Sequence, residues 1–261
     1  MSAFEFDEAA SRKLEAIYRT PEVIEQRRQV LEALKLAPGE SVLDIGSGPG
    51  LLAHQMALAV GEKGHVSGVD PSAAMVAMGA RRCSGLGWVE FKSGQATELP
   101  FPDAVFDAAV STQVYEFVRD ISAALQELQR VLRPGGRALI VDTDYGSLAI
   151  HTEDESRMAR VLAAWDEHFV HPHLPRSLTR QLREAGFAVE HRASIPMFNA
   201  EFDDNTYAKG MLETMASFAP GRRGVSESEA EAWFAEFARL GEEGRFFFSL
   251  NRYLFLARKI S

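Results

Sequence analysis

The sequence contains a single cysteine, Cys83, among its 261 residues. One thiol cannot form a disulfide within the chain, and a zinc site built from cysteines is almost excluded. We expect Cys83 to be a small buried apolar residue. The sequence has no apolar run close to the roughly 20 residues that span a bilayer. Its N-terminal segment lacks the basic start and apolar stretch of a signal peptide, so we expect a cytoplasmic protein without membrane insertion.

Basic residues are also scarce relative to acidic ones. The chain has 28 Lys and Arg against 37 Asp and Glu, which gives a formal net charge of −9. A surface of this sign repels nucleic-acid phosphates and anionic lipid headgroups. The sequence therefore favours a small molecule over nucleic acid as the partner.

Short apolar stretches alternate with helical patterns in the first part of the chain. Strands are predicted over 41–46, 65–70, 88–94, 106–112 and 137–144, and helices over 20–36, 51–60, 72–83 and 120–132. Strands that alternate with helices through short links form a parallel sheet with helices on both faces. We therefore predict an α/β protein with a doubly wound sheet.

The pattern changes after residue 145. Helices are predicted over 158–169, 176–186, 207–218 and 227–240, and strands over 187–198 and 245–259. Two late strands with helices between them fit an antiparallel edge on a parallel sheet. We predict one domain over 1–261, with N-terminal helices or a lid at 1–36, a ligand-binding core at 37–145 and a C-terminal part at 146–261. The helical insertion of that last part covers about 200–245.

A glycine-rich stretch, "SVLDIGSGPG", stands where the first predicted strand becomes a helix. Gly46, Gly48 and Gly50 would let a ligand approach the backbone, and the helix start offers free N–H groups. A tight turn without a ligand is the alternative. Asp70, at the end of the second strand, is placed either to accept hydrogen bonds from ribose hydroxyls or to cap the next helix.

The spacing of the glycines argues against a dinucleotide site. The G-x-G-x-x-G fingerprint would place its third glycine at position 51, which is Leu51. The acid before the loop, Asp44, would repel a pyrophosphate and suits a ligand with an ammonium or sulfonium group. A nicotinamide-dependent oxidoreductase is therefore disfavoured.

Four stretches resemble one family. "VLDIGSGPG", "VSGVDPSAAMVAMGARR", "SGQATELPFPDAVFDAAVSTQVYEFV" and "ALQELQRVLRPGGRALIVD" are similar to class I S-adenosylmethionine-dependent methyltransferases, in particular the small-molecule enzymes of the ubiquinone and menaquinone type. The resemblance covers about residues 30–142. It implies a Rossmann-like sheet of seven strands, ordered 3-2-1-4-5-7-6 with strand 7 antiparallel.

The resemblance also implies an activity and a cofactor. The protein would transfer a methyl group from S-adenosylmethionine to a small molecule and release S-adenosylhomocysteine, with no metal. Methyl transfer from a sulfonium is an in-line displacement, in which the protein mainly aligns the reactants. A cofactor-binding protein without catalysis is the alternative in a different class.

The family pattern assigns roles to matching residues. Asp44 and Gly46 would lie beside the methionyl part, and Asp70 would bind the ribose. The other implied cofactor contacts are Ser47, Gly48 and Gly50 in the loop, Pro71 beside Asp70, Gln95 and Ala96 near the adenine, and Ser111 and Thr112 near the reacting methyl group. Gln95 replaces the usual Asp, so its contact with the adenine amino group would carry no charge.

Fewer residues point to the acceptor site. Tyr18 and either Arg27 or Arg28 of the N-terminal segment are candidates for the cofactor, and arginine suits a carboxylate. We select Arg28 of the pair. Candidates for catalysis are Tyr115, Asp144 and His151. His151 follows the fifth strand, which makes it the first choice for a base. Three further histidines, His168, His171 and His173, are interpreted as surface or structural groups or as acceptor contacts rather than metal ligands.

Overall fold

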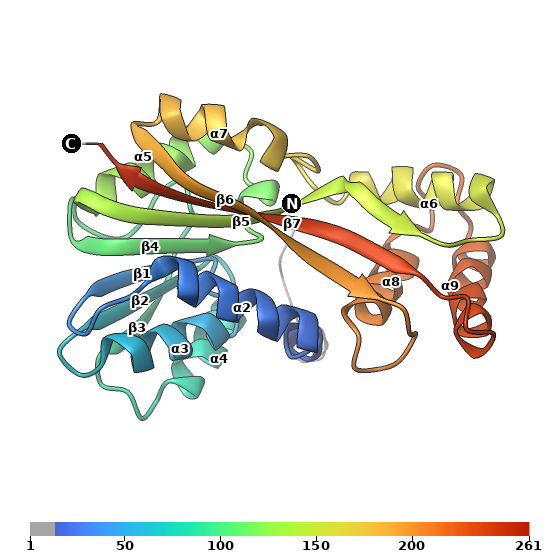
Figure 1. The fold of residues 1–261 in the computed structure, drawn as a ribbon, viewed down its shortest axis with the longest axis horizontal. Helices are drawn as coiled ribbons and strands as arrows, with labels where there is room; N and C mark the ends of the chain where they lie inside the picture. Colours follow the sequence, from blue (N-terminus) through green and yellow to red (C-terminus); the bar gives the residue numbers. More distant parts are fainter. Residues whose placement is uncertain (1–13, 261) are drawn as a thin grey trace.

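The computed structural model describes residues 14–260. A seven-stranded sheet with the order β3-β2-β1-β4-β5-β7-β6 forms its centre (Figure 1). The pairs β3–β2, β2–β1, β1–β4 and β4–β5 are parallel, whereas β7 is antiparallel to both β5 and β6. The predicted strand order and the antiparallel direction of β7 are therefore confirmed.

The secondary structure follows the predicted alternation. In chain order the elements are α2 (Pro21–Leu34), β1 (Ser41–Ile45), α3 (Leu51–Val60), β2 (His65–Asp70), α4 (Ala73–Arg82), β3 (Val89–Ser93), β4 (Phe106–Thr112), η1 (Tyr115–Phe117), α5 (Ile121–Val131), β5 (Leu132–Ile150), α6 (Glu155–Asp166), α7 (Pro175–Glu184), β6 (Phe187–Asn199), α8 (Tyr207–Phe218), α9 (Glu227–Glu242) and β7 (Phe248–Lys259). In the part of the chain with described coordinates, no helix is both long and apolar enough to cross a membrane.

The sheet separates two apolar layers because successive side chains of a strand point to opposite faces. In β1, Val42 packs with buried residues of α2 and α3, while Leu43 packs with those of α5 and α7. In β5, Leu139 joins the first layer and Ile140 the second. Both faces of these strands are covered, which explains their nearly continuous apolar sequences.

Strand β5 is longer than predicted. The sequence places its end at Asp144, but the strand continues to Ile150. Its pairing with β7 is interrupted after Asp144 and resumes at Ala149. The sequence does not reveal this second half, because Gly146 and the exposed positions around it interrupt the apolar pattern of a buried strand.

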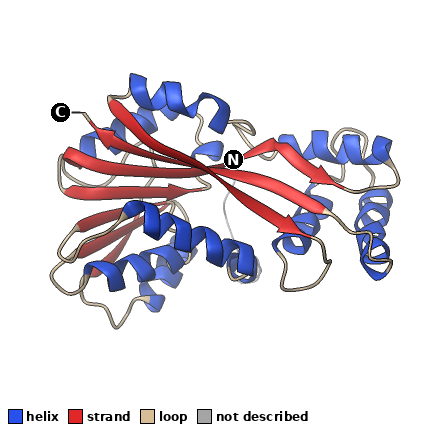
Figure 2. Cartoon of the chain, in the orientation of Figure 1, coloured by secondary structure: helices blue, strands red, loops and turns tan. Residues whose placement is uncertain are grey.

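The far halves of β5, β6 and β7 extend beyond the parallel strands and carry α6, α8 and α9 (Figures 1 and 2). We call this part the arm. Its helices and strand ends enclose a third apolar cluster that includes Trp165, Met215, Trp233 and Phe248. Helices α8 and α9 stand between β6 and β7, as predicted for the insertion. The predicted N-terminal lid at 1–36 lies partly outside the described residues.

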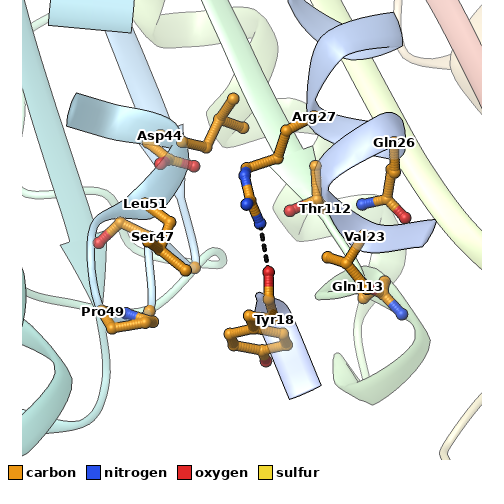
Figure 3. Close-up of a pocket in the computed structure, with 13 residues that line it drawn as sticks. Tyr18, Val23, Gln26, Arg27, Asp44, Ser47, Pro49, Leu51, Thr112 and Gln113 are labelled. Carbon is orange, nitrogen blue, oxygen red and sulfur yellow. Dashed lines mark hydrogen bonds between the residues drawn. The ribbon is translucent and has the colours of Figure 1, made fainter. Parts of the chain in front are cut away.

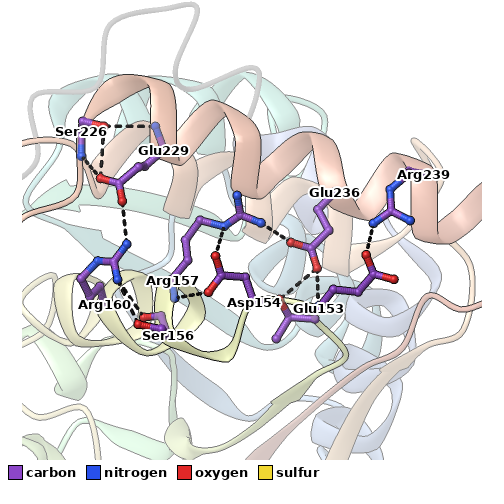
Figure 4. A network of polar contacts seen from close by, with 10 residues as sticks. Glu153, Asp154, Ser156, Arg157, Arg160, Ser226, Glu229, Glu236 and Arg239 are labelled. Atoms are coloured by element: carbon purple, nitrogen blue, oxygen red, sulfur yellow. Dashed lines mark hydrogen bonds and ion pairs between the residues drawn. The ribbon is translucent and has the colours of Figure 1, made fainter.

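Polar contacts join α6 to α9 in the arm (Figure 4). The buried carboxylate of Glu236 accepts hydrogen bonds from the Thr152 hydroxyl at 2.9 Å and the Glu153 amide at 2.6 Å, and it pairs with Arg157. On the next turns, Arg160 pairs with Glu229 at 2.6 Å. A buried carboxylate with its acceptor positions occupied holds the start of α6 against α9.

Shortening a core residue of the α5 layer tests this packing. Leu128 is 1% exposed and lies against the sheet. Leu128→Ala leaves a cavity, so we expect the free energy of unfolding to fall by about 2–5 kcal/mol. Denaturant titration followed by circular dichroism measures this loss. The matched control is Leu58→Ala on α3, where the leucine is 61% exposed and the change should stay within about 0.5 kcal/mol. Equal effects of the two substitutions would contradict the assignment of Leu128 to the core.

Candidate functional site

The glycine-rich loop joins the end of β1 to the start of α3. Gly46, Gly48 and Gly50 have φ angles of 68°, 51° and 77°, a region that side chains disfavour. A Cβ on Gly46 would lie 2.2 Å from a methyl carbon of Val114. The backbone can therefore take this path close to β4 only with glycine at position 46.

A pocket opens beside this loop (Figure 3). The loop, β4 and the N-terminal residues on α2 and before it form its wall. The lining residues are Tyr18, Val23, Gln26, Arg27, Asp44, Gly46, Ser47, Gly48, Pro49, Leu51, Leu52, Thr112 and Gln113. The structure thus brings together six of the residues predicted for the cofactor, namely Tyr18, Asp44, Gly46, Ser47, Gly48 and Thr112.

Asp44 is the acid at the bottom of this pocket. Its residue is 2% exposed, and burial together with the negative charge of Asp70 raises the pKa of Asp44 to about 8. The N–H of Ala53 offsets part of this shift. Carboxylate oxygen Oδ2 and the hydroxyl of Ser47 are buried without a partner among the described residues. Buried polar atoms are normally paired, so these two atoms indicate a ligand with hydrogen-bond donors.

Asp70 ends β2 and lies under the loop. Its two carboxylate oxygens accept hydrogen bonds from the N–H groups of Gly48 and Ser72, each at 2.9 Å. Burial raises the pKa of Asp70 although these two bonds lower it. Helix α4 is capped by the hydroxyl of Ser72 and not by Asp70. A carboxylate has about four acceptor positions, so two remain for a ligand.

The arginine at the pocket is Arg27 rather than Arg28. Arg28 lies on the outer face of α2 and pairs with Glu25 and Glu32. The selection of Arg28 is corrected by this placement, because consecutive side chains are about 100° apart around a helix and only Arg27 is on the buried face of α2. The Arg27 side chain is buried, donates to the main-chain oxygen of Tyr18 at 2.6 Å, and leaves its Nε without a partner in the described chain.

The remaining cofactor candidates lie outside the pocket wall. Pro71 is exposed next to Asp70, and Gln95 is exposed in the turn after β3. Ala96 is buried in the apolar layer of α5. Ser111 is 1% exposed in β4, and its hydroxyl has no partner within residues 14–260.

The three candidates for catalysis do not meet at the pocket. Tyr115 is completely buried in the α5 layer. His151 is exposed at the far end of β5, because that strand is longer than predicted. Burial raises the pKa of Asp144, but hydrogen bonds from Arg176 and His173 outweigh this effect and lower the pKa. Asp144 therefore links β5 to α7 and its preceding loop.

The histidine-rich segment also has structural contacts. His168 stacks on Trp165 with ring centroids 4.6 Å apart, and burial lowers the pKa of His168 to about 4. His173 lies 2.9 Å from Asp144. Within the described ranges, no group of three or more His, Cys, Asp or Glu residues has the arrangement to hold a metal ion.

Two buried charges near the pocket were missed by the sequence analysis. Glu116 in η1 and Arg252 in β7 are each only 1% exposed. Both stand in apolar sequence, "VYEFV" and "NRYLFLA". A charged residue inside an apolar run that is predicted to be buried is the signal that would have found them.

Comparisons with known proteins relate part of the chain to methyltransferases. Residues 43–140 match the family model described as "Methyltransferase domain". An uncharacterized 37.1 kDa protein of a Streptomyces fradiae transposon is 40% identical over 161 residues, which are 61% of this chain and 47% of that protein. The 2-phytyl-1,4-naphtoquinone methyltransferase of Synechococcus elongatus is 40% identical over 119 residues, or 44% of this chain and 51% of the enzyme. The chain spans about half the length of these curated relatives.

A solved structure shows the same fold. The crystal structure of a putative methyltransferase from Bacillus halodurans has a TM-score of 0.63 and 21% identity, covering 91% of this chain and all (100%) of that one. The family match covers the strands and the loop that build the pocket. Residues 43–140 of this chain are therefore similar to a methyltransferase domain, and the chain shares the fold of that solved structure.

Proposed function

We propose that the protein transfers a methyl group from S-adenosylmethionine to a small-molecule acceptor. The observation that carries this proposal is the unpartnered, buried carboxylate oxygen of Asp44 at the bottom of the glycine-lined pocket. A buried carboxylate with a raised pKa is stabilised by a cation. S-Adenosylmethionine carries both an ammonium and a sulfonium.

The residues of the pocket fit the parts of this cofactor. The Asp44 carboxylate and the Ser47 hydroxyl would accept from the ammonium, and the free Nε of Arg27 would donate to the carboxylate. The remaining acceptor positions of Asp70 would receive the ribose hydroxyls. When bound, S-adenosylmethionine supplies a methyl group on a positively charged sulfur. The chain's own contribution is to orient the reactants and exclude water.

The acceptor is proposed to be small because the arm stands over the same end of the sheet. Its apolar cluster includes residues of α8 and packs against Tyr18 of the pocket. The Synechococcus relative is named for a naphthoquinone substrate. A net charge of −9 works against a nucleic acid.

Labelled transfer tests the proposal directly. We expect purified protein, methyl-labelled S-adenosylmethionine and a small-molecule extract of the host to yield a labelled product in mass spectrometry. Label in nucleic acid or protein fractions alone would contradict a small-molecule acceptor. Binding of S-adenosylhomocysteine in calorimetry with no labelled product in any fraction would favour a cofactor-binding protein without catalysis.

Asp44→Asn tests the charge of the pocket. Because a charged hydrogen bond contributes about 1.5–3 kcal/mol, we expect calorimetry to show binding of S-adenosylhomocysteine about 10- to 100-fold weaker. The control is Asp103→Asn on the surface, where the side chain is 77% exposed and affinity should not change. Equal affinities of the wild type and Asp44→Asn would contradict the role of Asp44.

The raised pKa of Asp44 also predicts a pH dependence. The folded protein holds the Asp44 proton up to pH about 8, whereas the unfolded chain loses it near the usual value of 3.8. This contribution to stability is therefore present at acid pH and is lost as pH rises towards 8. We expect thermal unfolding of the ligand-free wild type to show a larger loss of stability between pH 5 and 8 than Asp44→Asn. Parallel curves for the two proteins would contradict the assignment.

A further inference from the structure

A second polar cluster lies beyond the cofactor pocket, at the junction of the core and the arm. It combines Glu116 of η1 and Arg252 of β7 with three tyrosines, Tyr18, Tyr145 and Tyr207. The Thr143 N–H and the Tyr145 hydroxyl donate to the Glu116 carboxylate. Arg252 is paired with Thr143 across β5 and β7 and lies over the Tyr207 ring. The five residues come from five separate segments of the chain, which converge beside the apolar cluster of the arm.

Glu116 is held rigidly in this cluster. Its carboxylate accepts hydrogen bonds from the Thr143 N–H at 3.1 Å and from the Tyr145 hydroxyl at 3.3 Å. Its main-chain oxygen accepts from the N–H groups of Val170 and His171 at 3.0 and 2.9 Å. No ion pair within 4.0 Å joins the Glu116 carboxylate to another described residue. Burial raises the pKa of Glu116 to about 7, although Thr143 and Arg252 lower it.

Arg252 is a buried cation with donors to spare. Its Nη1 donates to the side-chain oxygen of Gln26 at 2.5 Å, and its guanidinium carbon stands 4.6 Å from the centre of the Tyr207 ring. Its Nε is buried without a partner in the described part of the chain. A buried guanidinium with an unused N–H indicates that an acceptor atom is supplied from outside the chain.

The cluster adjoins the cofactor pocket directly. Gln26 lines the pocket and also accepts from Arg252. Tyr18 also lines the pocket, and the charges of Arg252 and Glu116 act on the pKa of its hydroxyl. Glu116 follows Thr112 and Gln113, which line the pocket at the end of β4. A molecule among these side chains would therefore lie next to the methyl donor.

We infer that Glu116 is the catalytic base of the reaction, that Arg252 stabilises the oxyanion, and that the acceptor is a phenol or an enol. This inference rests on the proposed function. The acceptor hydroxyl gives its proton to the Glu116 carboxylate. The acceptor's electron pair forms the new bond to the methyl carbon, while the pair of the breaking carbon–sulfur bond stays on sulfur.

The charges of the cluster favour a hydroxyl over an amine. An ammonium acceptor would be repelled by Arg252, whereas a developing negative charge on oxygen is stabilised by a buried guanidinium. Tyr18 lines the pocket, so its ring offers an apolar surface to an aromatic molecule, whereas Tyr145 stacks on Phe169 and Tyr207 lies under Arg252. The ionisable groups around Glu116 are Tyr18, Asp142, Tyr145, Tyr207 and Arg252. Asp142 is itself buried, and burial together with Glu116 raises the pKa of Asp142 well above its usual range.

The test uses 4-nitrophenol, whose phenolate is yellow. Full-length protein saturated with S-adenosylhomocysteine is titrated with 4-nitrophenol at a pH below the solution pKa of the probe. We expect the wild type to bind the probe as phenolate, because the Arg252 guanidinium stabilises the negative charge on oxygen. Glu116→Gln resembles the protonated base and should retain the phenolate signal, whereas Arg252→Gln should lose it. With an identified acceptor, Glu116→Gln should lower the rate on the order of 100-fold or more, and the rise of rate with pH near 7 should disappear.

The controls separate this inference from the proposed function. Thermal unfolding and affinity for S-adenosylhomocysteine should be nearly the same in Glu116→Gln and the wild type. 4-Nitroaniline is the matched amine probe and should bind more weakly than 4-nitrophenol. Preferred binding of the aniline, absence of nitrophenol binding, or an undiminished phenolate signal in Arg252→Gln would each overturn the inference. An unchanged rate of Glu116→Gln on an identified acceptor would overturn the role of Glu116 as the base. If either variant does not fold, neutral nitrophenol bound to the wild type overturns the inference. Failure to bind S-adenosylhomocysteine would instead contradict the proposed function.

Discussion

Buried negative charge at one edge of the sheet is the constraint on which the site depends. Parallel strands bring their carboxyl ends to the same edge, and in this chain β1 and β2 end at or beside an acid, Asp44 and Asp70, while β5 carries Asp142 one residue beyond Val141, the partner of Thr112 at the end of β4. All three have raised pKa values because they are buried. A fold that concentrates carboxylates in this way is stabilised by a ligand that brings positive charge. The backbone N–H groups of the loop alone leave that charge uncompensated.

The core of the fold could be predicted from the sequence because it rests on local patterns. The helix over Leu51–Val60, the strands over His65–Asp70 and Phe106–Thr112 and the helix over Tyr207–Phe218 coincide with their predicted ranges. The glycine loop and its acids were also found, since a motif of neighbouring residues fixes them. The family resemblance supplied the position of β7 in the sheet, which no local pattern encodes.

The cluster of Glu116 and Arg252 could not be predicted from the sequence, since its residues come together only in the folded chain. Glu116 and Arg252 are separated by more than half of the chain. Each is an isolated charged residue beside apolar residues, and neither belongs to a recognisable motif. The second half of β5 was missed because its pattern is not that of a buried strand. That error placed His151 near the site, whereas the extra strand length carries it to the end of the arm. The choice between Arg27 and Arg28 depended on how α2 is rotated about its own axis against the sheet, and the sequence does not fix this rotation to within one residue.

The continuity of β7 has a mechanical consequence. The strand runs from Phe248 to Lys259 and pairs with β5 and β6 in both the core and the arm. A ladder of main-chain hydrogen bonds that crosses the boundary resists bending far more than a linker does. The arm therefore cannot swing away from the core as a lid on a hinge. The residues of the arm that border the site are therefore held in fixed positions relative to the sheet.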